Sequence, residues 1–182
     1  MSTNLTGSQS LTERTSNPSR QKAVDCEVAV IGAGPYGLSA AVHLKASGES
    51  VRVFGEPMAF WAQKMPEGML LRSPRVASNI SDPTHTFTLE SYETAFGKPP
   101  SAPVPLGTFV DYGKWFCKHF SEDLDRRNVA RIGREGQRFV VVLEDGEKVR
   151  VRRVIVAAGI GPFKHKPDVF KHMHGGIRVR LT

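Results

Sequence analysis

Three glycines near the amino end of the chain constrain its fold more than any other feature. Gly32, Gly34 and Gly37 form a G-x-G-x-x-G pattern, which follows an apolar run at 26–31 and precedes a helical pattern at 38–45. The run contains β-branched residues and predicts a buried strand, whereas the apolar spacing after the glycines predicts a helix. A glycine pattern at a strand-to-helix turn is typical of phosphate binding.

Each glycine has a separate physical role in such a turn. Gly32 permits the tight turn, Gly34 lets a pyrophosphate approach the backbone, and Gly37 lets the helix lie close on the strand. The helix start then offers free N–H groups and the positive end of its dipole. The remaining residues of the predicted binding loop are Ala33, Pro35 and Tyr36. A proline is tolerated there because it lies in the opening turn of the helix. A plain glycine-rich turn is the alternative interpretation.

A second strand is predicted at 51–54, which completes a βαβ unit with a right-handed crossover. An acid at the end of this strand binds ribose hydroxyls in dinucleotide sites. Here Gly55 takes that place, and the acid, Glu56, comes one residue later. Glu56 is predicted to reach a ribose if the strand is extended or bulged, and a solvated turn glutamate is the alternative.

The chain from 57 to 107 is rich in proline and shows little periodicity, so we predict irregular chain that lines a site. Thr108 is predicted to cap the following helix. The spacing of its aromatic residues predicts a stripe that faces the core, formed by Phe109, Tyr112, Gly113, Phe116 and Phe120.

The last third of the chain predicts strands. A strand is expected at 129–132, and runs at 139–143 and 149–152 flank Asp145-Gly146, which is a strong hairpin signal. In the second run, basic residues alternate with valines, so we expect them on opposite faces. A buried strand at 154–158, ended by Gly159, is predicted to follow.

Composition excludes several classes of protein. No run approaches the ~20 apolar residues of a membrane span, and the first residues contain no apolar stretch typical of a signal peptide. We therefore expect a cytoplasmic protein without a membrane partner. The net charge of +7 lies almost wholly in 148–182. Arg150 and Arg152 are expected on one strand face without interleaved aromatic residues, so no specific nucleic-acid partner is expected.

The cysteines and the amino-terminal segment add two further expectations. Cys26 and Cys117 lie too far apart for a CxxC pair, and no metal site is predicted. They are expected to be small buried side chains. Residues 1–24 are dominated by Ser, Thr, Asn and Gln, which predicts a disordered tail.

Residues 28–44 resemble the FAD-binding start of the flavin-dependent monooxygenases, among them the flavin-containing monooxygenases and the lysine and ornithine N-hydroxylases. The segment 154–159, VIVAAG, is similar to the strand that passes near FAD in two-dinucleotide-domain flavoproteins, and 137–152 matches their β-meander in position. A looser similarity covers 73–83. The resemblance implies an α/β fold, a Rossmann-like FAD/NAD(P)-binding domain with a parallel sheet and a β-meander.

The resemblance also implies roles for residues beyond the glycine loop. Trp61 would contact the flavin edge, and Arg72 would pair with a phosphate or with the pyrimidine carbonyls of the flavin. A core tryptophan and a surface arginine are the alternatives. Val129 or Ala130 would bind adenine through backbone groups, and Ala158 and Gly159 would lie near FAD.

The same resemblance implies a domain division. We expect an FAD-binding domain at 25–163 and a basic tail or truncated linker at 164–182. Family members carry a second glycine fingerprint for NADPH after the VIVAAG strand, and none follows here. A second dinucleotide domain is therefore expected to be missing, and the chain alone is expected to reduce flavin poorly.

The implied function is that of an FAD-dependent oxidoreductase of monooxygenase type. It would take hydride from NADPH or NADH and pass oxygen to a small-molecule substrate, with the flavin carrying the chemistry. No catalytic side chain is assigned, because the place of a family asparagine holds Arg72, with Asn79 further on. A non-catalytic dinucleotide-binding module is the alternative.

Overall fold

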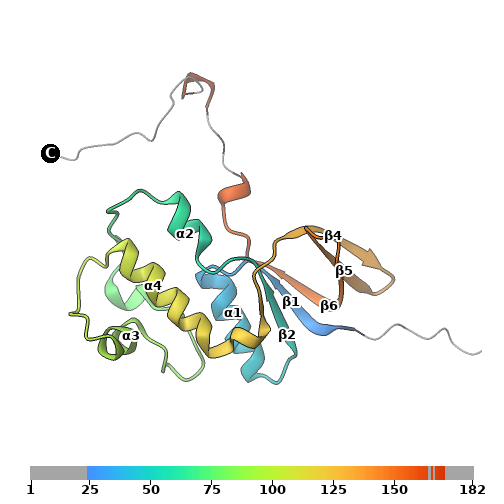
Figure 1. The fold of residues 1–182 in the computed structure, drawn as a ribbon, viewed down its shortest axis with the longest axis horizontal. Coiled ribbons are helices and arrows are strands. Elements are labelled where there is room, and N and C mark those ends of the chain that lie inside the picture. Colours follow the sequence, from blue (N-terminus) through green and yellow to red (C-terminus); the bar gives the residue numbers. More distant parts are fainter. Residues whose placement is uncertain (1–23, 164, 166, 171–182) are drawn as a thin grey trace, which may run out of the picture.

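A computed structural model describes residues 24–163, 165 and 167–170 (Figure 1). The predicted tail at 1–24 lies outside these residues except for Val24, and most of the predicted segment 164–182 also lies outside them. The helices are α1 (Pro35–Ala46), α2 (Ala59–Lys64), α3 (Leu89–Ala95) and α4 (Leu106–Cys117). The strands are β1 (Cys26–Ile31), β2 (Val51–Phe54), β3 (Leu124–Asp125), β4 (Val129–Glu135), β5 (Arg138–Leu143) and β6 (Lys148–Val156).

One mixed sheet of six strands organises the described chain, in the order β3-β2-β1-β6-β5-β4. Strands β3, β2, β1 and β6 run parallel, whereas β5 and β4 continue antiparallel as a meander. The helices gather to one side, and the β4 and β5 strands lie away from them (Figure 1). This arrangement confirms the predicted α/β class with a parallel sheet and a β-meander.

Strand β6 belongs to both parts of the sheet. Val151 pairs with Phe139 of β5 on one side and with Cys26 of β1 on the other. The prediction of two strands at 149–152 and 154–158 is therefore wrong, because no Gly or Pro interrupts the chain and one strand runs through to Val156. The hairpin prediction is confirmed, since β5 and β6 pair antiparallel around the Asp145-Gly146 turn.

Two apolar clusters lie on opposite faces of the sheet, as the period of two along a strand requires. On the helix side, Val28, Val30 and Val53 pack with Leu38 of α1 and with α4. The other cluster joins Ala29 and Phe54 of the parallel strands to meander residues, which are Val141, Leu143, Val149 and Val151. The first cluster holds the helices on the parallel strands, and the second holds the meander on them.

Helix α4 carries the predicted aromatic stripe but begins earlier than expected. Phe109, Tyr112, Gly113 and Phe116 are buried, whereas the side chain of Phe120 lies outside the described part of the chain. Thr108 is not the cap: the helix starts at Leu106, after Pro105. A β-bridge from Leu70 holds Pro105 extended, so the first helical residue comes directly after it.

The proline-rich segment contains two short helices that its sequence does not predict. At α3, the Thr88 hydroxyl accepts a hydrogen bond from the Ser91 backbone N–H. Tyr112 anchors the chain before α3, because its hydroxyl donates to the Phe87 carbonyl at 2.7 Å and accepts from the Ile80 N–H at 3.0 Å. Helices of six and seven residues are too short for the repeated apolar spacing from which a helix is predicted.

The described residues bear on the cysteines and on membrane-spanning helices. Cys26 and Cys117 are buried and form no disulfide with each other, which confirms their assignment as small buried side chains. Within the described residues, every helix is too short or too polar to cross a membrane.

Candidate functional site

The three glycines at the β1–α1 junction differ in what surrounds them. At Gly32, which has φ +114°, a Cβ would lie 2.3 Å from the Ala157 carbonyl oxygen. At Gly37 it would lie 1.8 Å from the Gly32 carbonyl oxygen. At Gly34 it would have no neighbour within 4 Å. Two glycines therefore permit close packing of the chain, and the third leaves open space in front of the helix.

The start of α1 faces this open space with unpaired donors. Gly34 is the N-cap in an extended conformation, Pro35 occupies the first turn, and no side chain caps the helix. The first N–H groups of a helix have no intrahelical acceptors, and the helix dipole adds partial positive charge there. The loop therefore presents backbone donors to an anion.

A cavity of about 600 Å³ opens beside this loop, at the carboxyl ends of β1 and β6. Its size falls in the ordinary range for cofactor sites. Ten of the twelve predicted site residues line it: Gly32, Ala33, Gly34, Pro35, Tyr36, Glu56, Trp61, Val129, Ala158 and Gly159. The structure thus brings together residues that lie more than a hundred positions apart in the sequence.

Two predicted residues lie elsewhere. Gly37 is buried against the Gly32 backbone, so its contribution is to packing of α1 on β1. Arg72 is exposed on the loop after Leu71 and is not part of the cavity lining. Its position fits the alternative of a surface arginine.

Helix α2 forms one wall of the cavity through Phe60 and Trp61. Trp61 packs edge-on against Phe109 of α4, with ring centroids 4.9 Å apart, so it belongs to the core as well as to the lining. Met58, just before α2, has φ 57° and donates its backbone N–H to the Ala33 carbonyl at 3.0 Å. This contact fixes α2 beside the glycine loop.

The cavity also includes residues that sequence reasoning missed. Phe60, Asn128, Ala157 and Ile160 line it together with the predicted set. The Phe60-Trp61 pair was a detectable aromatic signal, but Asn128 and Ile160 carry none. Asn128 follows β3 and Ile160 follows β6, and both reach the cavity because these parallel strands end at the same edge of the sheet.

The displaced acid reaches the cavity without any extension of β2. The strand ends at Phe54, and Gly55, with φ +116°, donates its N–H to the Asp125 carbonyl at 2.8 Å. The turn at Gly55 brings Glu56 to the cavity edge, where Arg126 Nη1 lies 2.5 Å from Glu56 Oε1. The Glu56 side chain is 46% exposed, so it is accessible to a ligand.

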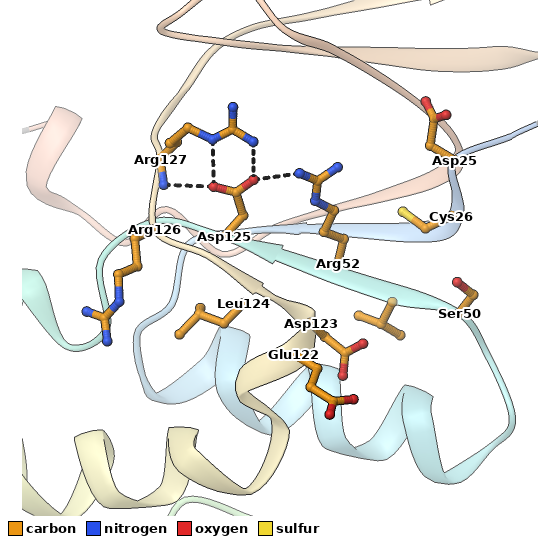
Figure 2. A pocket seen from close by; sticks show the side chains of 11 residues that line it. Asp25, Cys26, Ser50, Arg52, Glu122, Asp123, Leu124, Asp125, Arg126 and Arg127 are labelled. Atoms are coloured by element: carbon orange, nitrogen blue, oxygen red, sulfur yellow. Dashed lines mark hydrogen bonds and ion pairs between the residues drawn. The ribbon is translucent and has the colours of Figure 1, made fainter.

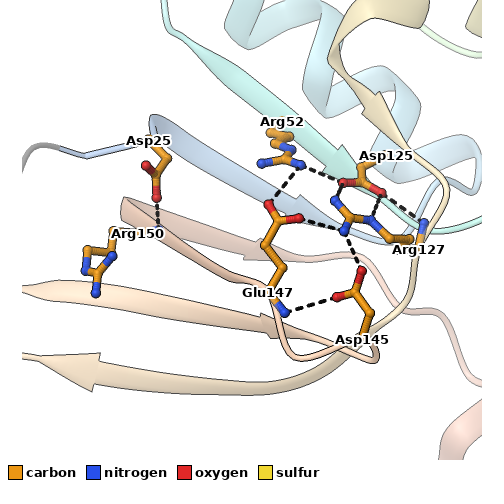
Figure 3. A network of polar contacts seen from close by, with 7 residues as sticks. All are labelled: Asp25, Arg52, Asp125, Arg127, Asp145, Glu147 and Arg150. Carbon is orange, nitrogen blue, oxygen red and sulfur yellow. Dashed lines mark hydrogen bonds and ion pairs between the residues drawn. The ribbon is translucent and has the colours of Figure 1, made fainter.

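A second, polar cavity of about 550 Å³ lies beside β2 and β3 (Figure 2). Arg52 and Arg127 flank the Asp125 carboxylate, which accepts from Arg52 Nη2 at 2.7 Å and from Arg127 Nη2 at 2.6 Å. Arg127 Nη1 also reaches Asp145 and Glu147 of the β5–β6 turn, each at 2.6 Å (Figure 3). These charges pair with one another and tie the meander to the parallel strands.

This network gives a prediction about acid stability. Replacing Asp125 by Asn is expected to lower the free energy of unfolding by about 2 kcal/mol near neutral pH, because two guanidinium groups lose a largely buried carboxylate. The Arg127 guanidinium, assisted by Arg52, holds the pKa of Asp125 well below its ordinary value.

The pH dependence of this contribution has a definite sign. A carboxyl whose folded-state pKa is lowered stabilises fully above its unfolded pKa of about 3.9, and loses this effect as pH falls toward the folded value. Urea unfolding of parent and Asp125→Asn protein should therefore differ most at neutral pH and less near about pH 2.5. A difference that is constant or grows in acid would contradict the assignment.

Across the residues that the structure describes, no group of three or more His, Cys, Asp or Glu side chains is arranged to hold a metal ion. The site offers backbone donors, an acid and apolar walls.

A βαβ unit with an open glycine position at the helix start defines this chain as a dinucleotide-binding α/β domain. Residues 26–179 match the family model described as pyridine nucleotide-disulphide oxidoreductase. The chain belongs to this family and is an FAD/NAD(P)-binding oxidoreductase domain. No curated protein matches it.

Solved structures show the same fold in larger enzymes. A flavin-containing monooxygenase from Stenotrophomonas maltophilia is 26% identical, with a TM-score of 0.60, over 72% of this chain and 38% of that one. The bacillithiol disulfide reductase Bdr (YpdA) from Staphylococcus aureus is 18% identical, with a TM-score of 0.61, over 74% and 38%.

A third similar structure is a complex with both cofactors. OTEMO in complex with FAD and NADP is 20% identical, with a TM-score of 0.61, over 76% of this chain and 26% of that one. This chain therefore spans between about a quarter and two fifths of the length of these proteins. The expected resemblance to flavin-dependent monooxygenases is confirmed at the level of the shared domain.

Proposed function

We propose that the cavity beside the glycine loop binds FAD, and that the protein is a flavin-dependent oxidoreductase of monooxygenase type. The observation that carries the proposal is the contrast among the three glycines. Gly32 and Gly37 are packed against backbone, whereas a Cβ at Gly34 would enter the space in front of the α1 N–H groups. A diphosphate needs that space and those donors.

The other lining residues fit the remaining parts of such a cofactor. Glu56 offers a carboxylate to ribose hydroxyls, and Val129 offers backbone groups to the adenine. Trp61 contributes an aromatic wall, held by Phe109, and Ala158 and Gly159 close the side near the end of β6. When bound, FAD would supply hydride acceptance and oxygen chemistry, while these residues bind it, orient it and exclude water.

Two observations favour a monooxygenase over a disulfide reductase. The flavin-containing monooxygenase is the more similar of the two relatives in sequence, at 26% against 18% identity. The only two cysteines of the sequence are buried, and burial raises the pKa of both thiols, that of Cys117 to about 12. A buried, protonated thiol is a poor nucleophile for disulfide exchange, so neither cysteine of this domain suits that reaction.

The co-substrate and the substrate follow from the same proposal. NADPH or NADH would reduce the flavin, and a small molecule with a nucleophilic atom would receive the oxygen. The binding of FAD and NADP by OTEMO supports this choice of cofactors.

The absorbance spectrum of the freshly purified chain tests the cofactor. We expect the absorbance spectrum of a bound flavin. If the protein is purified without flavin, we expect the fluorescence of added FAD to change as it binds to the apoprotein. FMN and ADP serve as controls, because FMN lacks the adenosine half and ADP lacks the flavin.

The outcomes separate the proposal from its alternative. Saturable FAD binding, tighter than that of either control, supports a flavoprotein. A colourless chain that binds ADP as tightly as FAD would indicate a non-catalytic dinucleotide-binding module instead. A chain that binds none of the three would overturn both.

A further inference from the structure

Three arginines lie close together around β3 but have different partners. Arg52 and Arg127 share the Asp125 carboxylate, and Arg127 is paired further with Asp145 and Glu147. The Arg126 side chain points away from Asp125, Arg52 and Arg127 (Figure 2). It contacts Glu56 at the edge of the glycine-loop cavity.

The backbone at Arg126 is held on both sides. Asp125 pairs with Phe54 in the β2–β3 ladder, and its carbonyl accepts from the Gly55 N–H at 2.8 Å. On the other side, the Arg127 backbone N–H donates to Asp125 Oδ1 at 3.1 Å. Because successive residues of extended chain point to opposite sides, this anchoring directs the Arg126 side chain toward Glu56.

Glu56 needs such a partner because β2 does not hold it. It lies two residues beyond the end of the strand, after a glycine with φ +116°. Its carboxylate would otherwise be a freely rotating side chain of a turn. Arg126 Nη1 contacts only Oε1 in the structure, which leaves Oε2 for another donor.

We propose that Arg126 is a positioning residue that holds the Glu56 carboxylate for the adenosine ribose, and that the pair selects ribose with free hydroxyls over 2′-phosphorylated ribose. The inference rests on the proposed binding of an adenine dinucleotide in this cavity. Free hydroxyls can donate hydrogen bonds to the Glu56 carboxylate, whereas a 2′-phosphate would be repelled by its negative charge. Arg126 does not offset this repulsion, because it is already paired with Glu56.

Binding of ADP and of ADP carrying a 2′-phosphate to the 182-residue chain tests the proposal. The parent should prefer ADP. Arg126→Ala should weaken ADP binding by about fivefold, which is the upper range for an exposed ion pair, and should raise the preference for ADP over the 2′-phosphorylated form. Arg126→Lys should restore part of the loss in ADP binding.

Replacing the acid should act in the opposite direction on selectivity. In Glu56→Gln, the carboxylate charge is gone and Arg126 is released, so the preference for ADP should fall by about tenfold. A merely structural role of the pair would weaken both ligands equally and leave this ratio unchanged. Arg131→Ala, which removes an exposed arginine of β4, should match the parent in both measurements.

The failure of this inference differs from the failure of the proposed function. If the parent binds FAD and ADP but Arg126→Ala keeps the parental ADP affinity and selectivity, the positioning role is wrong. Equal loss of both ligands in the variants also overturns it. If the parent binds neither FAD nor ADP, the assignment of the cavity itself fails.

Discussion

Gly34→Val is expected to remove FAD binding almost completely while leaving the protein folded. The new side chain would occupy the space in front of the α1 N–H groups and displace the diphosphate from two or more charge-assisted hydrogen bonds. At about 1.5 kcal/mol or more for each bond, FAD affinity should fall by about 100-fold or more. Titration of apoprotein with FAD, followed by flavin fluorescence, measures this loss.

The stability of this variant should change little, for reasons visible in the backbone. Gly34 has φ −81° and ψ −179°, which any residue adopts, and its Cβ would touch nothing within 4 Å. Loss of glycine at an N-cap costs less than about 1 kcal/mol. Gly107→Val, in the exposed first turn of α4, is the matched control and should keep parental FAD affinity. Parental affinity in Gly34→Val would place the phosphates elsewhere.

Gly37→Ala should have the opposite effect, with a large loss of stability. Its Cβ would lie 1.8 Å from the Gly32 carbonyl oxygen, so α1 must move away from β1. Overpacking against backbone costs about 3 kcal/mol or more, and the gain in helix propensity returns only about 1 kcal/mol. We expect a net decrease of at least about 2 kcal/mol in the free energy of unfolding.

Urea denaturation measures this decrease, and α4 again offers a control. Gly107→Ala also replaces a helical glycine, but its Cβ has no neighbour within 4 Å, so only the propensity gain remains. It should stabilise the protein or leave it unchanged. If Gly37→Ala unfolds at the same urea concentration as the parent, α1 does not pack against the Gly32 backbone closely enough to exclude a methyl group.

Local signals were sufficient for the amino-terminal unit. The apolar run of β1, the glycine pattern and the apolar spacing of α1 each lie within a few residues of one another, so a short window of sequence contains all the physics that shapes them. The same holds for the Asp145-Gly146 hairpin and for the aromatic stripe of α4.

Elements fixed by distant contacts were predicted less well. The start of α4 depends on a bridge from Leu70, and α2 depends on Met58, whose buried side chain lies where a Cβ on Gly113 would be. Neither contact leaves a periodic trace in the sequence. Arg72 is expected in the site only through the family resemblance, and its loop lies outside the cavity lining.

The sequence by itself determined the βαβ unit and the presence of an open glycine at its turn, because backbone conformation and burial there follow from neighbouring residues. Only the tertiary structure decided which side chains close the cavity and what holds Glu56. Arg126 and Glu56 are 70 residues apart, and they meet because β3 pairs beside β2. Such a meeting depends on strand order, which no local pattern of residues specifies.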